Sequence, residues 1–71
     1  MDLEEYLFRH RIKKSHFAIG LGIAPGHFYA ILAKRRRPSV NLAIKIEEMT
    51  DGKVSKEEVL FPEDFQQEEN V

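Results

Sequence analysis

Four consecutive cations, Lys34 to Arg37, follow an apolar segment in which Phe28, Ile31 and Leu32 recur at helical spacing. Lysine and arginine clustered in this way neutralise phosphate groups of a nucleic acid. The surrounding sequence is GIAPGHFYAILAKRRRPS. We expect a helix that reads DNA, followed by cations that bind the DNA backbone.

The charges are divided unevenly along the chain, although its formal net charge is only −1. Residues 1–46 hold nine Lys or Arg against three acids, which gives +6, and residues 47–71 hold two against nine, which gives −7. This separation indicates a basic surface for a polyanion and an acidic end that keeps the molecule soluble or contacts something else. The alternative is that the charge runs are only solvated faces.

Size and composition exclude several kinds of protein. A chain of 71 residues forms one small domain that buries about 60% of its unfolded surface, so a roomy catalytic cleft is not expected. Without cysteine there is no disulfide framework and no thiolate zinc site. The start, MDLEEYLFRHR, does not resemble a signal peptide, and no apolar run approaches the roughly 20 residues of a membrane span. We expect a soluble, cytoplasmic protein with no membrane partner.

No group of residues indicates catalysis or a cofactor. The sequence has no glycine-rich phosphate loop and no nucleophile with a placed base. His10, His16 and His27 lack the spacing and the supporting ligands of a zinc site. We therefore expect neither an enzyme nor a bound metal or other cofactor.

The elements that must position the cations are about five short helices, with no convincing strand. Capping and breaking residues set their limits. The predicted helices run from Asp2 to about Ile12, from His16 to Leu21 with Ser15 as N-cap, from Pro25 to about Arg36, from the N-cap Ser39 to Asp51-Gly52, and from Ser55 to Pro62. The fold class is therefore all-α, a small helical bundle.

Helical spacing also predicts which side chains are buried. Ser55 and Glu58 form a capping box, with Val54 and Val59 as its hydrophobic staple. The other positions that we expect to face the core are Leu3, Tyr6, Leu7, Leu42, Ala43, Ile46 and Met49.

Four residues have the spacing of two helices that cross steeply through a tight turn. Ala18 is small where the helices approach, Gly22 can take a positive φ at the turn, and Phe28 and Ile31 are apolar anchors under the second helix. The neighbouring core positions are Phe17, Leu21 and Ile23. This pattern predicts a helix-turn-helix. An ordinary helical bundle would need Gly22 only as a C-cap and would leave the cations unexplained.

The chain resembles the Xre family of Cro and phage-repressor type helix-turn-helix regulators. Lys14 to Leu32, K-x-x-F-A-x-x-L-G-I-x-x-x-x-F-x-x-I-L, is similar to the two central helices of that family, and R-R-R-P-S, Arg35 to Ser39, to its basic link. Residues 40–61 resemble Cro-like or YdaS-like prophage and antitoxin proteins. The resemblance implies a lambda-repressor-like fold and a sequence-specific transcription regulator, most simply a repressor, that binds double-stranded DNA as a homodimer.

Groove geometry then assigns contacts, with the third helix in the major groove and the start of the second helix at the backbone. The candidate base-facing residues are Pro25, Gly26, His27, Tyr29, Ala30 and Ala33. The candidate phosphate contacts are Lys14, Ser15, Lys34, Arg35, Arg36 and Arg37. Few of the base-facing residues can make bidentate base contacts, so readout is expected from Tyr29 and His27, from methyl contacts of Ala30, and from DNA shape. The alternative for Tyr29 is packing on the second helix.

A protein-interaction module is the alternative function. The low polar content from Gly26 to Ala33 motivates it, because an apolar third helix could hold a partner protein such as a toxin or another regulator.

We also expect a domain of residues 1–62 and an acidic, flexible tail of residues 63–71. The homodimer surface is placed after Met49, including Val59, Phe61 and Phe65, with packing of these residues on the first helix as the alternative.

Overall fold

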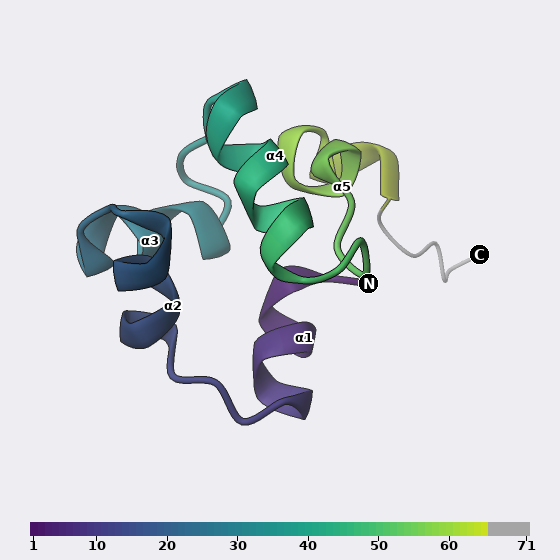
Figure 1. The fold of residues 1–71 in the computed structure, drawn as a ribbon. Coiled ribbons are helices and arrows are strands. Elements are labelled where there is room, and N and C mark those ends of the chain that lie inside the picture. The colour runs from purple at the N-terminus through teal and green to yellow at the C-terminus, as the bar shows by residue number, and fades with distance from the viewer. Residues whose placement is uncertain (66–71) are drawn as a thin grey trace.

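The structure is a computed structural model that describes residues 1–65, with side chains up to residue 63. Within these residues the chain forms five α-helices and one 3-10 helix and contains no strand, which confirms the predicted all-α bundle. The elements are α1 (Leu3–Arg9), α2 (Lys14–Leu21), α3 (Pro25–Leu32), α4 (Val40–Met49), α5 (Lys56–Leu60) and η1 (Pro62–Phe65) (Figure 1). No helix in this part of the chain is long and apolar enough to cross a membrane.

Side-chain caps begin three of the helices where the sequence predicts them. Asp2 accepts hydrogen bonds from the amides of the first turn of α1, and Ser39 Oγ accepts one from Leu42 N at 3.1 Å. Ser55 and Glu58 form the predicted capping box of α5. The cap predicted for α2 is wrong: the helix begins at Lys14, its N-cap is Lys13, and Ser15 lies inside the first turn.

Four helices end through one hydrogen-bonding pattern, in which a residue with positive φ follows the last turn. These residues are Arg11, Gly22, Lys34 and Asp51, with φ values of 56°, 81°, 66° and 54°. After α3, Lys34 N donates to Ile31 O at 3.1 Å and Arg35 N donates to Ala30 O at 2.9 Å. This pair of bonds is the Schellman motif, which satisfies carbonyls at the end of the helix.

The same motif shortens two helices relative to their predicted lengths. The first helix ends at Arg9 rather than about Ile12, because Arg11 leaves the helical conformation and Ile12 N donates to Leu7 O at 2.9 Å. The third ends at Leu32 rather than about Arg36. The four cations therefore lie in the connection between α3 and α4 and not on a helix.

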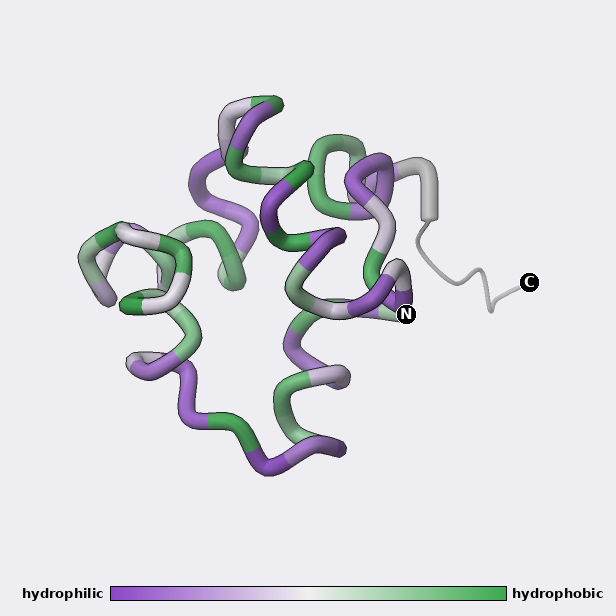
Figure 2. Tube along the Cα trace, viewed as in Figure 1, coloured by the Kyte–Doolittle hydropathy of each residue, from purple (hydrophilic) through white to green (hydrophobic). Residues whose placement is uncertain are grey.

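The core lies where α4 meets α1, α5 and the α2–α3 pair (Figures 1 and 2). Ala18, Phe28, Ala43 and Ile46 have no exposed surface. Five residues of the predicted motif core are buried, whereas Ile23 is partly buried and Gly22, at the turn, is exposed. The partner of these residues from α1 is the predicted apolar face, Leu3, Tyr6 and Leu7.

Met49, predicted to be buried, is instead 38% exposed. Its terminal methyl lies against α2, only 3.0 Å from where a Cβ on Gly20 would be. The buried position at the end of α4 is taken by the next residue, Thr50. The Thr50 hydroxyl donates to Ile46 O at 3.0 Å and accepts a hydrogen bond from Val54 N at 3.2 Å, so this side chain ties α4 to the connection that precedes α5.

The residues proposed for the dimer surface have different environments. Val59 is buried in the same cluster as Leu3 and Leu7, so for this residue packing beside α1 is correct. Phe61 is 46% exposed, while the side chain of Phe65 lies outside the described part of the chain. Of the predicted tail, residues 63–65 belong to η1, and residues 66–71 lie outside the described residues.

Candidate nucleic-acid interface

The candidate interface is built on α2 and α3, which are joined by residues 22–24. The rings of Phe17 and Phe28 pack with centroids 5.6 Å apart, and Ala18 between the helices is fully buried. Gly22, with its φ of 81°, allows the chain to turn directly after α2. The two helices are therefore held in one arrangement by a small, well-packed contact.

A second set of contacts fixes this pair against α4. Lys45 Nζ lies 3.4 Å from Leu21 O and donates a hydrogen bond to the last turn of α2. The terminal methyl of Met49 lies beside Gly20 on the same helix. A cation near a helix C-terminus also interacts favourably with the helix dipole.

The predicted base-facing residues of α3 are not all accessible. Pro25, Gly26 and Ala33 are exposed, Tyr29 is 44% exposed, and His27 is half-buried. The prediction that Ala30 faces the groove is wrong, because only 9% of its surface is exposed. The amides of Arg35 and Arg36 donate to Ala30 O, so the connection after α3 folds back beside this residue.

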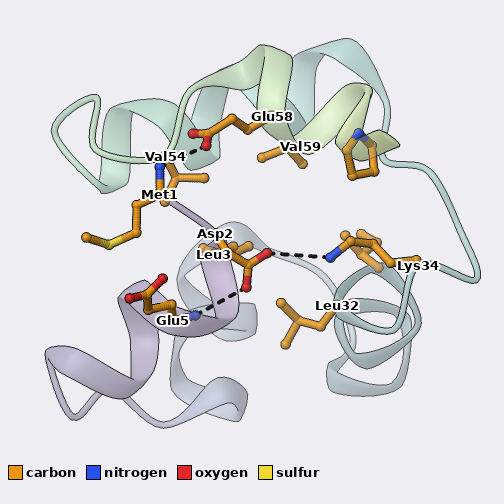
Figure 3. A pocket seen from close by; sticks show the side chains of 11 residues that line it. Met1, Asp2, Leu3, Glu5, Leu32, Lys34, Val54, Glu58 and Val59 are labelled. Carbon is orange, nitrogen blue, oxygen red and sulfur yellow. Dashed lines mark hydrogen bonds and ion pairs between the residues drawn. The ribbon is translucent and has the colours of Figure 1, made fainter. Parts of the chain in front are cut away.

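Two of the predicted phosphate contacts have carboxylate partners from α1. Lys34 Nζ lies 3.6 Å from the Asp2 carboxylate, and Lys14 Nζ lies 3.2 Å from Glu4. Figure 3 shows the first of these pairs at a hollow between the start of α1, the end of α3 and α5. Asp2 therefore has two roles, since it caps α1 and also pairs with the cation cluster.

Arg37 is the most tightly engaged member of the cluster. Its guanidinium donates to the carbonyl oxygen of Leu60, lies 3.4 Å from the Glu63 carboxylate, and sits 5.7 Å from the centre of the Phe61 ring. These contacts tie the connection between α3 and α4 to the segment that follows α5. The buried Pro38 is the next residue in that connection.

Arg35 and Arg36 differ from their neighbours. Both are exposed, and neither makes an ion pair or a side-chain hydrogen bond within residues 1–63. Their backbone is nevertheless fixed, because both amides donate to Ala30 O, at 2.9 and 3.3 Å. The structure thus presents two adjacent guanidinium groups to solvent from an ordered connection.

The starts of α2 and α3 have no side-chain caps. Neither Lys13, the N-cap of α2, nor Ala24, the N-cap of α3, makes a side-chain capping bond. Free amides at a helix N-terminus favour an anion or a hydrogen-bond acceptor. The half-buried Ser15 lies in the first turn of α2, beside the exposed Lys14.

Sequence reasoning missed the internal partners of the cations. Four neighbouring cations look alike in a sequence, and only the fold brings Asp2 to Lys34 and Glu63 to Arg37.

Within residues 1–65, no three His, Cys, Asp or Glu side chains are grouped so that they could hold a metal ion. No family model, curated protein or solved structure matches the chain.

Proposed function

We propose that the protein is a sequence-specific DNA-binding transcription regulator in which α2 and α3 act as a helix-turn-helix. The observation that carries the proposal is the pair of exposed guanidinium groups of Arg35 and Arg36, which have no ion-pair partner within residues 1–63 and lie in the connection directly after α3. An ordered pair of cations beside a helix with an exposed face matches the electrostatic footprint of a DNA-binding module.

In the proposed complex α3 enters the major groove, and its N-terminal residues approach the base edges. Tyr29 and His27 are the available hydrogen-bonding readers, while Arg35 and Arg36 contact phosphate. The uncapped start of α2 contacts the backbone on the other side of the groove. A homodimer would place two such units on half-sites about one helical turn apart and would repress by occupying the promoter.

The test is fluorescence anisotropy with DNA from the region upstream of the gene, titrated at several salt concentrations against a scrambled competitor. We expect preference for the upstream DNA and a linear fall of log affinity with log salt. Each lost phosphate contact should lower the steepness of that line by about 0.9. The double variant Arg35→Ala/Arg36→Ala should therefore lower it by about 1.8.

The matched control is Lys53→Ala/Lys56→Ala, which removes two cations from the acidic half of the chain. Lys53 is exposed, and Lys56 pairs with Glu47 and Glu57. The control should bind with nearly the slope of the unchanged protein. An equal loss of slope in both variants would mean that net charge, and not this connection, determines binding.

A protein-interaction module is the second candidate, and the burial of Ala30 favours it. Without Ala30, the accessible candidates include Pro25 and Gly26 of α3 and its C-cap Ala33, none of which has a side chain that can hydrogen-bond to a base. Binding with no preference over the scrambled competitor would support this candidate and contradict sequence-specific regulation.

A further inference from the structure

A hollow of about 450 Å³ lies between the start of α1, the end of α3 and α5, and the proposed DNA contacts do not use it. Its apolar walls are Leu3, Leu32, Val54 and Val59, and Figure 3 shows Leu32 and Val59 on opposite sides of it. A concave site of this size with apolar walls is typical of sites for small organic molecules. We therefore asked which ligand the polar groups around it would accept.

A second hollow, of about 310 Å³, adjoins the first, since four residues line both: Ile31, Lys34, Val59 and Pro62. Its remaining walls are Arg35, Arg36, Arg37 and Glu63. Arg37 pairs with Glu63, whereas Arg35 and Arg36 have no ion-pair partner within residues 1–63. An apolar hollow thus borders a cationic one.

The carboxylates around the apolar hollow are already paired with cations. Asp2, Glu5 and Glu58 line it, and each lies within an ion pair, at 3.6, 2.6 and 2.8 Å. A ligand in this hollow therefore meets no carboxylate that lacks a cation.

Lys34 is the cation that an incoming anion can most easily recruit. It lies at the boundary of the two hollows, its side chain is 52% exposed, and its one ion-pair partner within residues 1–63 is Asp2, at 3.6 Å. An exposed pair at this distance is weak, so it can be exchanged for a carboxylate of a ligand. Such a carboxylate would have Arg35 and Arg36 as further donors in the walls of the second hollow.

We propose that the two hollows together bind a small amphipathic organic anion, with the chemistry of a medium-chain carboxylate. Its apolar chain lies between Leu32 and Val59, and its carboxylate lies at the boundary of the hollows, beside Lys34. Arg35 and Arg36 are also the proposed phosphate contacts, so the bound anion competes with DNA for them. Binding of the anion does not depend on the proposed function, and only this competition rests on it.

The primary test is titration of the isotope-labelled full chain with octanoate, followed by amide chemical shifts without DNA. We expect the shifts to cluster at Leu32, Lys34 and Val59 and to be absent at Phe8 and Ile12, which line a separate hollow. Acetate lacks the apolar chain and octylammonium reverses the charge. Each should bind about tenfold or more weakly than octanoate.

Two double variants locate the carboxylate. Arg35→Ala/Arg36→Ala should weaken octanoate binding by about tenfold, because it removes two charged donors. The matched control is Arg11→Ala/Lys13→Ala. It removes two exposed cations that line the hollow beside Phe8 and make no ion pair within residues 1–63, so octanoate binding should be unchanged.

Competition with DNA is measured by fluorescence anisotropy of labelled DNA at constant ionic strength. At an octanoate concentration about ten times its own Kd, the apparent Kd for DNA should rise by about tenfold. Acetate at the same concentration gives the baseline. Octanoate binding that leaves DNA affinity unchanged would overturn the competition. Octanoate binding by a protein that does not bind DNA would support the ligand site and contradict the proposed function.

Three results would overturn the ligand site itself. Shifts that centre on Phe8 or spread evenly over the surface would place octanoate elsewhere. Equal binding of octanoate and octylammonium would show that the cations do not select the ligand. An equal loss of affinity in the two double variants would mean that net charge alone attracts the anion.

Discussion

Replacing Lys34 by glycine should stabilise the protein even though it removes an ion pair. Lys34 has a φ of 66°, in the left-handed region, where a side chain costs roughly 1 kcal/mol or more relative to glycine. The backbone bonds that need this conformation, Lys34 N to Ile31 O and Arg35 N to Ala30 O, do not involve the side chain and would remain.

The opposing effect is loss of the contact between Lys34 and Asp2. The nitrogen and oxygen are 3.6 Å apart, and each side chain is 52% exposed, so the pair contributes at most a few tenths of a kcal/mol. The backbone effect exceeds it. Lys34→Gly should therefore raise the free energy of unfolding by about 0.5–1 kcal/mol.

Urea and thermal denaturation followed by circular dichroism measure this difference. The control is Lys34→Ala, which loses the ion pair but keeps the left-handed strain and should be slightly less stable than the unchanged protein. For a domain of this size, a 1 kcal/mol difference corresponds to about 4–8 °C in Tm. If Lys34→Gly were less stable than Lys34→Ala, the assignment of strain to this position would be wrong.

Two further predictions concern Thr50 and the arginines. Thr50→Val keeps the shape of a buried side chain but leaves Val54 N without its hydrogen-bond partner. The free energy of unfolding, measured by urea titration, should therefore fall by about 1–3 kcal/mol. An unchanged urea midpoint would contradict the role given to the Thr50 hydroxyl. Arg37→Ala should lower stability by about 1 kcal/mol yet leave the salt slope of DNA binding unchanged, because its guanidinium is bonded to the Leu60 carbonyl and Glu63. Arg35→Ala should do the opposite, lowering the slope by about 0.9 with little change in stability, and a reversed pattern would refute the division of roles.

Local sequence signals predicted the helices well where a cap or a glycine marks the boundary. Asp2, Ser39 and Ser55 begin helices as expected, and Gly22 ends α2 with a positive φ. Apart from the cap predicted for α2, the boundary failures occur where non-glycine residues take a positive φ. Arg11 and Lys34 follow the ends of α1 and α3 with positive φ. Their side chains do not predict a helix end, because arginine and lysine are both good helix formers.

The candidate site was less predictable than the fold because it depends on contacts between distant residues. Spacing alone placed Ala30 on the outer face of α3, but the chain after Lys34 folds back beside it. Likewise, Arg37 appears in the sequence as one of four equivalent cations, and only the position of Glu63 distinguishes it. Such distinctions arise from tertiary structure, which periodicity does not encode.

The contacts of α4 with the end of α2 limit how far the α2–α3 pair can be treated as a transferable unit. A graft of residues 14–36 into another scaffold would lose the hydrogen bond that Lys45 donates to Leu21 O and the packing of Met49 beside Gly20. The grafted helices would keep the Phe17–Phe28 contact between them but not the contacts that hold α2 against α4. A graft that is to keep its binding specificity would therefore also need the supporting residues of α4, although these residues touch no ligand themselves.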